Sequence, residues 1–507
     1  MIRELLDRLV CPYCGGGLRL SHEVSGTAER LRYGLLECRC FTFPVVDGIP
    51  LLSLAKAYGG AEERLQPYVP LQVAAIKFLK ANDLDGLRGW IARHLPLAAD
   101  LMADGPMSFI DCSMRMAEEL ESASTDYLAE CGRYEVLGHP GLPLALARAG
   151  KTRRLRTHLR QSAAYVRARL GLRKLSRRLS PEAFRQEQLN SYYVARYFMP
   201  RRNSMALQCR RLPAARRLLS LCCGHGVFEH IQRTLGHSGA DVVSVDGQFL
   251  NLLITRRYAA PDGNYICHDI QFPLPFADGA FDGVFSSTCL PEIPSQKSFV
   301  REALRVTDAR GWTCFDSIWG LSHGLQRVNG LRYYRFCQNL FAEVGGYLEL
   351  FGEVAGGRTV LADVPDQPER YARAAGWRPA AELRPLLGEQ LDSTLHVLVL
   401  PAGSVSTESA MAEDDDWPRC AQLAISPAYS LHRAGSDWEL QRLPVFSGSG
   451  INVASRDFIG MPDHVRLTAS DLRDNRRRRE LFSQGVLALL PEDFGTSSPL
   501  VADLLNA

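Results

Sequence analysis

A glycine turn at residues 222–226, reading Cys-Cys-Gly-His-Gly, constrains the fold of this chain more than any other short stretch. The apolar run 217–221 precedes the turn, and the start of a helix follows at residue 227. Gly224 and Gly226 allow the backbone to turn sharply and to lie close to a ligand. A strand, a glycine turn and a helix in this order are typical of the first unit of an open parallel sheet.

Further strands follow at the spacing that such a sheet requires. A second apolar strand ends in Asp246, 22 residues after Gly224, where a carboxylate can accept hydrogen bonds from a ribose diol. A third strand ends at Asp269, a fourth covers 281–286, and a helix and a fifth strand follow within 299–319. This alternation predicts an α/β fold with a doubly wound, mostly parallel sheet and a ligand at the carboxyl ends of its strands. A nicotinamide-binding fold explains the glycine turn and Asp246 equally well.

Residues 269–287, which read DIQFPLPFADGAFDGVFSS, separate these alternatives. The stretch closely resembles the class I S-adenosylmethionine-dependent methyltransferases, especially those that act on small molecules. The resemblance runs from about residue 210 to 401 and includes residues 371–402, which look like the closing helix and the last strand pair. It implies a set of cofactor-binding residues: Ser220, Cys222, Gly224, Gly226, Asp246, Gly247, Asp269, Ile270 and Ser286.

The resemblance also assigns parts of the cofactor to these residues. The glycine turn would lie beside the methionine part, and Asp246 would accept hydrogen bonds from the ribose hydroxyls. Asp269 and Ile270 would lie against the adenine, with Ser286 at the lip of the site.

Two residues depart from the family pattern. Ser220 stands where the family usually has the acid that helps to hold the cofactor's ammonium group, and Cys222 stands where it usually has glycine. We therefore expect Ser220 to weaken the hold on the ammonium group or to leave that contact to water. A non-catalytic scaffold with the methyltransferase fold is the alternative that these departures support.

Four cysteines near the N-terminus have the spacing of a metal site. Cys11 and Cys14 form a C-x-x-C knuckle, and Cys38 and Cys40 form a C-x-C knuckle after 23 intervening residues. Four thiolates on two knuckles match a closed tetrahedral zinc site, and a segment this small builds little core without such a staple. Four reduced core cysteines are the alternative.

The residues around these knuckles carry a second resemblance. Together with Leu5, Leu6 and Leu9, the stretch FTFPVVDGIPLL at 41–52 is similar to the small zinc-ribbon proteins that activate tRNA and translation-factor methyltransferases. The resemblance covers about residues 1–54 and implies an activator supplied in the same chain. We therefore expect the ribbon to pack on the core, where it can add a strand to the open edge of the sheet.

The substrate leaves weaker signals. The Asn-Pro-Pro-Tyr or Asp-Pro-Pro-Tyr tetrad of enzymes that methylate adenine or glutamine nitrogen is absent after the fourth strand. Glu292, in the loop 289–294, is a candidate catalytic base or a residue that orients the loop, and His225 is interpreted as a loop residue. We expect methyl transfer to an oxygen or nitrogen nucleophile of a small, peptide or carrier-linked substrate.

The segment between the two recognised modules is helical and basic. Residues 63–102 show helical periodicity, and residues 148–178 hold twelve Lys and Arg and no acid. This run can be a solvated helix face, a site for RNA or phosphate, or a contact with an anionic membrane or carrier. An RNA methyltransferase is therefore the other catalytic alternative. The aromatic residues just before the sheet, Tyr192, Tyr193 and Tyr197, can line the cofactor pocket or pack in the core.

The whole chain, 507 residues, has room for about three domains. We expect a zinc ribbon at 1–56, a helical basic insert at 57–205, the methyltransferase domain at 206–402, and an acidic linker with an α+β appendage at 403–507. Within that appendage, 480–494 reads as helical. The cysteines are too sparse for a disulfide scaffold, and the start has no signal peptide, so we expect a cytoplasmic protein without a membrane span. The oligomeric state is not indicated.

Overall fold

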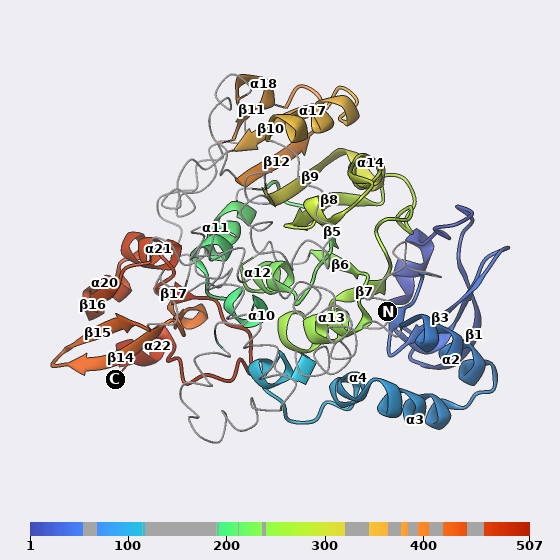
Figure 1. Cartoon of the computed structure of the whole chain (residues 1–507), viewed down its shortest axis with the longest axis horizontal. Helices are drawn as coiled ribbons and strands as arrows, with labels where there is room; N and C mark the ends of the chain where they lie inside the picture. The colour runs from blue at the N-terminus through green and yellow to red at the C-terminus, as the bar shows by residue number, and fades with distance from the viewer. Residues whose placement is uncertain are drawn as a thin grey trace, which may run out of the picture.

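The structure is a computed structural model of the chain (Figure 1). It describes residues 1–53, 68–113, 115–116, 189, 192–210, 212–235, 240–319, 344–363, 377–383, 394–404, 419–443 and 461–506. Within these ranges, no helix has both the length and the apolar character needed to cross a membrane. Residues 148–178 lie outside them, so the prediction for that basic run stays a prediction.

An eight-stranded sheet forms the centre of the described structure, in the order β11-β10-β12-β9-β8-β5-β6-β7. Its strands are β5 (Arg217–Leu221), β6 (Asp241–Asp246), β7 (Asn264–Cys267), β8 (Phe281–Ser287), β9 (Thr307–Trp319), β10 (Thr359–Asp363), β11 (Arg378–Pro379) and β12 (Thr394–Leu400). The strands β7, β6, β5, β8 and β9 are parallel, whereas β12, β10 and β11 pair antiparallel. This confirms the doubly wound, mostly parallel sheet predicted from the sequence.

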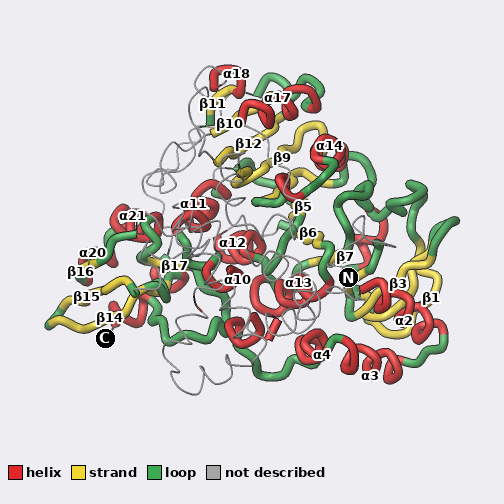
Figure 2. Tube along the Cα trace, in the orientation of Figure 1, coloured by secondary structure: helices red, strands yellow, loops and turns green. Residues whose placement is uncertain are grey.

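Helices cover both faces of the sheet (Figure 2), because neighbouring residues of each strand point to opposite sides. Leu218 packs on the face covered by α12 (Val227–Leu235) and α13 (Phe249–Ile254), which the π-helical turn η2 (Thr255–Ala259) continues. Leu219 packs on the other face, under α14 (Gln296–Val306) and α17 (Val344–Val354). Short turns, η3 (Leu290–Glu292) and α18 (Ala380–Leu383), complete this layer.

The N-terminal module is a separate four-stranded antiparallel sheet that contacts the β7 edge (Figure 1). It contains η1 (Arg3–Arg8), β1 (Arg19–Gly26), β2 (Leu31–Glu37), β3 (Thr42–Val46) and β4 (Ile49–Pro50). Directly after β4, Leu51 forms a parallel bridge with Cys267 of β7. The module therefore packs on the core at the open edge of the sheet, as expected.

Helices and two small C-terminal sheets, β13-β17 and β14-β15-β16, surround this core in the described part of the chain. Three helices follow the N-terminal module, α2 (Tyr68–Lys80), α3 (Leu84–His94) and α4 (Pro96–Met102), which confirms the helical reading of that region. Before β5 come α10 (Tyr192–Ala195) and α11 (Pro200–Cys209). The C-terminal segments are η6 (Cys420–Gln422), β13 (Ala424–Ile425), β14 (Tyr429–Ala434), β15 (Asp437–Arg442), β16 (His464–Leu467), α20 (Ala469–Arg473), α21 (Asn475–Ser483), β17 (Leu487–Ala488) and α22 (Val501–Asn506).

The expected helix over 480–494 is wrong beyond Ser483. Gly485 has a φ of +75°, which ends the helix, and β17 then pairs with β13. Asn203 of α11 donates hydrogen bonds to the carbonyl oxygens of Phe482 and Leu487, at 2.6 and 3.0 Å, so the appendage packs on the helix that precedes the sheet.

Candidate functional site

The glycine turn lies at the carboxyl end of β5. Gly224 and Gly226 have φ values of +55° and +80°, in the left-handed region that favours glycine. A Cβ on Gly226 would lie 2.5 Å from the Thr255 side chain, so the turn packs directly against η2. The turn therefore needs glycine at position 226 for space as well as for backbone conformation.

Asp246 ends β6 and ties the second strand to this turn. Its carboxylate accepts hydrogen bonds from the Gly224 amide at 2.9 Å, from the Gln248 amide at 2.8 Å and from the Asn251 side chain at 3.1 Å. The residue is 7% exposed. The acid and the glycine turn are thus brought together as the sequence predicts, at the edge where a parallel sheet binds its ligand.

Asp269 and Ile270 follow β7 in a segment that we call the 267–277 loop. Ile270 is buried, and Asp269 is 9% exposed, with a carboxylate oxygen that accepts a hydrogen bond from the Gln271 amide at 3.1 Å. The Asp269 amide donates to the Ser53 hydroxyl at 2.5 Å. Ser53 comes from the N-terminal module, 216 residues away in the sequence, so that module contacts the residue expected to face the adenine.

The N-terminal module holds the 267–277 loop at both ends. At the start of the loop, the Leu52 amide donates to the Cys267 carbonyl at 2.9 Å. At its end, the Val10 amide donates to the Pro275 carbonyl oxygen at 3.0 Å, and the Ala277 amide donates to the Arg8 carbonyl oxygen at 3.2 Å. These hydrogen bonds fix the backbone of the loop that carries Asp269.

An ion pair and aromatic contacts add to this interface. Asp47, only 4% exposed, pairs with Arg32 of its own module at 2.8 Å and with Arg256 of η2. The Tyr13 ring, between the first two cysteines, lies 5.7 Å from the ring of Phe272 in the loop. A charge this deeply buried is stable only with its partners in place, so the module and the core depend on one another.

The four predicted metal ligands meet at one point. The sulfurs of Cys11, Cys14, Cys38 and Cys40 all lie within 4.8 Å of one another. Zinc–sulfur bonds of about 2.3 Å in a tetrahedron place sulfurs about 3.8 Å apart, so the cluster has the dimensions of a zinc site. The Tyr13 amide donates to Cys11 Sγ at 3.4 Å, and the Phe41 amide donates to Cys38 Sγ at 3.3 Å. Burial alone would raise the pKa of Cys38, but hydrogen bonds from the Cys40 and Phe41 amides and from neighbouring cysteine side chains lower it to about 7.

The missing acid at position 220 has a counterpart on α12. Ser220 of β5 and Ser244 of β6 are partners in the sheet, and Ser244 donates to the Glu229 carboxylate at 2.8 Å. Burial raises the pKa of Glu229 to about 6, although the two serine hydroxyls lower it. Glu229 is 2% exposed and does not line the cavity beside the turn, so it is not placed to reach a cofactor ammonium group.

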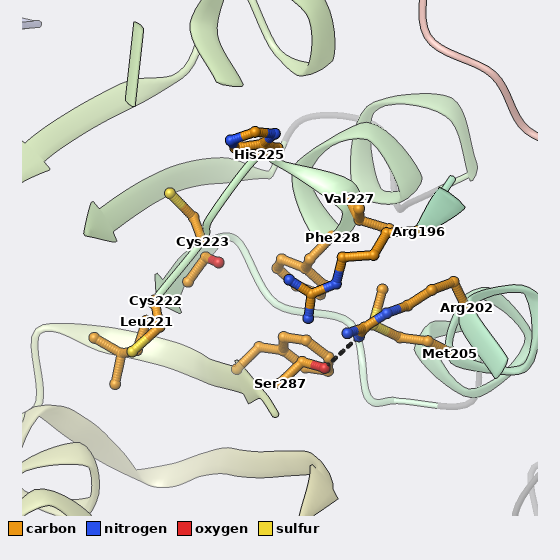
Figure 3. A pocket seen from close by; sticks show the side chains of 12 residues that line it. Arg196, Arg202, Met205, Leu221, Cys222, Cys223, His225, Val227, Phe228 and Ser287 are labelled. Carbon is orange, nitrogen blue, oxygen red and sulfur yellow. Dashed lines mark hydrogen bonds between the residues drawn. The ribbon is translucent and has the colours of Figure 1, made fainter. Parts of the chain in front are cut away.

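A small cavity of about 30 Å³ lies beside the glycine turn (Figure 3). It is lined by Arg196, Arg202, Met205, Ser220, Leu221, Cys222, Cys223, His225, Val227, Phe228, Phe285 and Ser287. Arg196 donates to the Thr288 hydroxyl at 2.8 Å, and its guanidinium lies 3.9 Å from where a Cβ on Gly224 would be. Arg202, 5% exposed, donates to Ser287 at 2.6 Å.

A buried network supports this cavity from the next strands. The Ser287 hydroxyl donates to Asp316 at 2.8 Å, and His396 of β12 contacts the same carboxylate at 2.8 Å. Burial alone would raise the pKa of Asp316, but His396, Arg202 and Ser287 hold it well below its usual range. Asp316 is therefore a fixed negative charge 3.9 Å from the Arg202 guanidinium.

Strained backbone also gathers at this edge. Cys222, Thr288 and Ser317 have φ values of +57°, +59° and +58°, in the left-handed region. Cys222 and Thr288 directly follow β5 and β8, and Ser317 lies two residues before the end of β9. Such residues cost about 1 kcal/mol or more each, and they cluster at functional sites. The carboxyl ends of β5, β8 and β9 thus carry the features expected of a ligand site.

The arrangement agrees with a known family model. Residues 219–315, from β5 into β9, match the model described as a methyltransferase domain. The core has the class I methyltransferase fold. No curated protein sequence matches the chain.

Solved structures of methyltransferases are also similar to this chain. A plantazolicin methyltransferase is 14% identical, with a TM-score of 0.33, and the match covers 45% of this chain and 95% of that one. A Thermotoga maritima S-adenosylmethionine-dependent methyltransferase is 15% identical, with a TM-score of 0.30 and coverage of 41% and 93%. A complex between the Haloferax volcanii Trm112 methyltransferase activator and a methyltransferase is 14% identical, with a TM-score of 0.30 and coverage of 43% and 94%.

The other predicted residues of the methyltransferase core lie as follows. Gly247 follows Asp246 directly, and a Cβ there would lie 3.9 Å from the His268 carbonyl oxygen. Ser286 is 3% exposed, at the end of β8, and Glu292 is exposed at the end of η3 and does not line the cavity.

Two further side chains near the turn belong to the core. Tyr197 is buried and donates from its hydroxyl to the His225 carbonyl at 2.6 Å, so it packs under the turn. The side chains of Tyr192 and Tyr193 lie outside the described ones. Burial, together with Arg196, lowers the pKa of His225 to about 3, so the imidazole is neutral near pH 7.

Sequence reasoning missed Arg196, Arg202, Ser53 and Glu229. The two arginines precede the first strand of the core in a stretch without a motif, and Ser53 lies just beyond the Gly-Ile-Pro stretch of the N-terminal module. The signal available for Glu229 was Ser220 itself, because a serine in place of the family's usual acid suggests that an acid elsewhere in the sequence lies near that position.

Proposed function

We propose that this chain is an S-adenosylmethionine-dependent methyltransferase whose N-terminal ribbon, with zinc on Cys11, Cys14, Cys38 and Cys40, forms one wall of the cofactor site. The observation that carries the proposal is the joined geometry of Gly224 and Asp246 inside the segment that matches the methyltransferase model. An acid hydrogen-bonded to a glycine turn, at the carboxyl ends of parallel strands, suits a ribose diol next to a flexible polar tail.

Different residues of the chain then bind different parts of the cofactor. Asp246 accepts hydrogen bonds from the ribose hydroxyls, with Gly247 leaving room beside it. Asp269 and Ile270 hold the adenine from the 267–277 loop. When bound, the cofactor supplies an electrophilic methyl group, so the protein's task is to position and desolvate the acceptor.

The residues proposed to bind the methionine part of the cofactor differ from the family pattern in this chain. Ser220 supplies no charge for the ammonium group, whereas the Arg196 guanidinium lies over the glycine turn. We infer that Arg196 binds the cofactor's carboxylate, since charge-assisted hydrogen bonds from arginine to carboxylate are strong and directional. Ser286, at the end of β8, would border the same space.

The ribbon acts in this proposal through the 267–277 loop. Its contacts at Leu52, Ser53 and Val10 pin the loop that holds the adenine. Zinc is structural here, because a closed set of four thiolates leaves no position for a substrate. Zinc binding would stabilise the folded module, and the contacts of that module with the loop would thereby strengthen cofactor binding.

The acceptor is proposed to be an oxygen or nitrogen nucleophile of a small, peptide or carrier-linked molecule. We assign the catalytic base that would deprotonate the acceptor to no buried residue. Glu292, in the loop 289–294, remains the candidate for that base. We also propose the division into a ribbon at 1–56, an insert at 57–205, a catalytic domain at 206–402 and an appendage at 403–507.

Calorimetric titration with S-adenosylhomocysteine tests the proposal. Reduced, zinc-loaded protein should bind one equivalent per chain. Asp246→Ala should weaken binding by about 2–3 kcal/mol, roughly 30- to 150-fold, because a hydrogen-bonding charge is lost. Asp262→Ala, which removes an exposed acid from the turn between η2 and β7, is the matched control and should bind as the parent does.

Two results would contradict this assignment. A folded, reduced and zinc-loaded parent that binds no S-adenosylhomocysteine would leave a methyltransferase fold without its cofactor. An Asp246→Ala variant with parental affinity would show that the ribose site lies elsewhere.

A further inference from the structure

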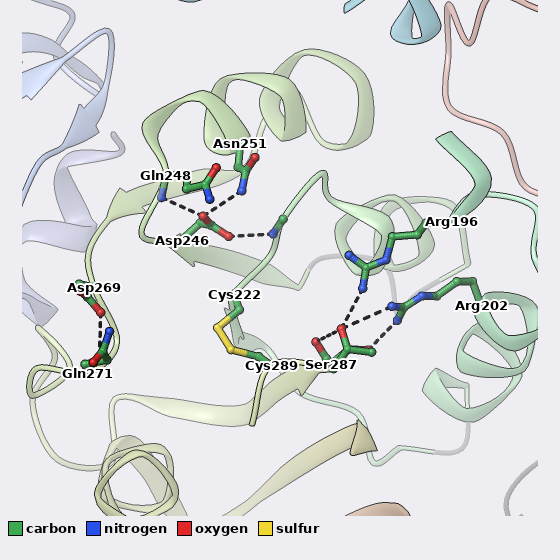
Figure 4. Close-up of a disulfide and its surroundings, with 12 residues drawn as sticks. Arg196, Arg202, Cys222, Asp246, Gln248, Asn251, Asp269, Gln271, Ser287 and Cys289 are labelled. Carbon is green, nitrogen blue, oxygen red and sulfur yellow. Dashed lines mark hydrogen bonds between the residues drawn. A yellow bond between two sulfur atoms is a disulfide. The ribbon is translucent and has the colours of Figure 1, made fainter. Parts of the chain in front are cut away.

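A disulfide crosses the floor of the proposed cofactor site. Cys222 of the glycine turn is bonded to Cys289, just after β8, at a sequence separation of 67 and with 6.4 Å between their Cα atoms. Figure 4 shows the bond between Asp246 and Asp269 on one side and Arg196 and Arg202 on the other. In this view the two sulfurs lie between Asp269, proposed for the adenine end, and the two arginines.

Cys222 is a costly residue for its position. Its φ of +57° is left-handed, where a side chain costs about 1 kcal/mol or more relative to glycine. The Cys222 side chain replaces the hydrogen atom that glycine would have at this point of the turn, and Cys222 is one of the residues that line the cavity beside the turn. The cysteine is therefore held here at an energetic cost to the backbone.

The bonded state leaves little room. With the disulfide formed, the cavity beside the turn has about 30 Å³, enough for about one water molecule. The bond also joins the two loops that border this space, after β5 and after β8. Separation of these loops is the movement that would widen the cavity.

We propose that Cys222 and Cys289 are an oxidation site that closes the methionine end of the cofactor site. This inference rests on the proposed function. The oxidant is a peroxide or a disulfide such as oxidised glutathione. With hydrogen peroxide, one thiolate attacks an oxygen to give a sulfenic acid and hydroxide, and the second thiol then displaces water from the sulfenic acid as the sulfur–sulfur bond forms. Two electrons leave the thiol pair, and a dithiol reductant returns them.

Both cysteines are open to such chemistry. Each is half-buried, so small oxidants and reductants can reach the pair. Closure by oxidation would lower cofactor affinity without unfolding the sheet, because the remaining strand contacts do not involve these sulfurs. Reduction would restore binding.

The test compares cofactor affinity in reduced and oxidised protein. Zinc-loaded full-length chain is equilibrated in reduced or oxidised glutathione, peptide mapping by mass spectrometry confirms the Cys222–Cys289 bond, and S-adenosylhomocysteine is titrated into each sample. Oxidation should weaken binding at least about tenfold. Cys289→Ser should bind equally in both buffers. It carries the same four knuckle thiols, so any fall that it shares with the parent has a cause other than the Cys222–Cys289 bond.

Several results would overturn the inference. Equal affinity of the reduced and the oxidised parent for S-adenosylhomocysteine, with the bond verified, would mean that the disulfide has only a structural role. Failure of the bond to form, or a redox-dependent affinity retained by Cys289→Ser, would remove the pair from control of the site. Absence of binding in the reduced parent would instead overturn the proposed function, so the two failures are distinguishable.

Discussion

Replacing Glu229 by glutamine should stabilise the protein at alkaline pH. Glu229 is buried between β5, β6 and α12, and its carboxylate accepts a hydrogen bond from Ser244. Glutamine has nearly the same shape and keeps an oxygen for that hydrogen bond, but it carries no charge. The substitution therefore isolates the effect of ionising an acid in this position.

The size of the effect follows from the pKa. Burial raises the pKa of Glu229 to about 6 from its ordinary value of 4.5. A difference of about 1.5 units corresponds to about 2 kcal/mol. Between pH 4.5 and 6 the folded protein binds more protons at this site than the unfolded chain, so the free energy of unfolding falls as the pH rises. Above pH 6 the full penalty of about 2 kcal/mol is present, and Glu229→Gln removes it.

Urea unfolding at pH 5 and pH 8 measures this difference. At pH 8 the variant should have a free energy of unfolding up to about 2 kcal/mol higher than the parent, and at pH 5 the gain should be much smaller. Other groups, such as buried histidines and the zinc site, also respond to pH, but they are common to both proteins and cancel in the comparison.

Glu349→Gln on α17 is the matched control, because Glu349 is exposed. It should change stability little at either pH. A Glu229→Gln variant that is no more stable than the parent at pH 8, or whose gain is equal at both pH values, would refute the reasoning.

The remaining predictions concern the ribbon. Elemental analysis should find one zinc per chain, and Cys38→Ser should lower both zinc content and the melting temperature, whereas well under one zinc in the parent would reject the metal site. Ser53→Ala should weaken S-adenosylhomocysteine binding by about two- to tenfold, because the Asp269 amide loses its acceptor, and Ser53→Thr should bind nearly as the parent does. Equal calorimetric affinity for Ser53→Ala would separate the ribbon from the adenine loop.

The parts that the sequence predicted are local. The zinc knuckles depend on spacings of two or three residues, and the glycine turn and Asp246 depend on the order of strands and loops along one stretch of chain. Both could be read because a motif and the structure around it lie close together in the sequence. The packing of the ribbon on the sheet was expected only because the residues at 41–52 resemble those of a known activator.

The parts that the sequence did not predict arise from contacts between distant segments. Ser53 meets Asp269 across 216 residues, and Cys222 meets Cys289 across 67. Neither pair has a spacing rule, since register and packing bring them together. Glu229 was missed for a related reason, because helical periodicity tells which residues share a face but not what that face covers.

Cofactor affinity before and after zinc removal tests the central claim, that the ribbon is part of the cofactor site, most directly. The reduced full-length chain is stripped with a chelator, titrated with S-adenosylhomocysteine, and titrated again after zinc is restored. We predict that the dissociation constant rises at least about tenfold in the metal-free protein and returns to its original value with zinc. An unchanged dissociation constant in the metal-free protein would contradict the account, because the 267–277 loop would then hold the adenine without the ribbon.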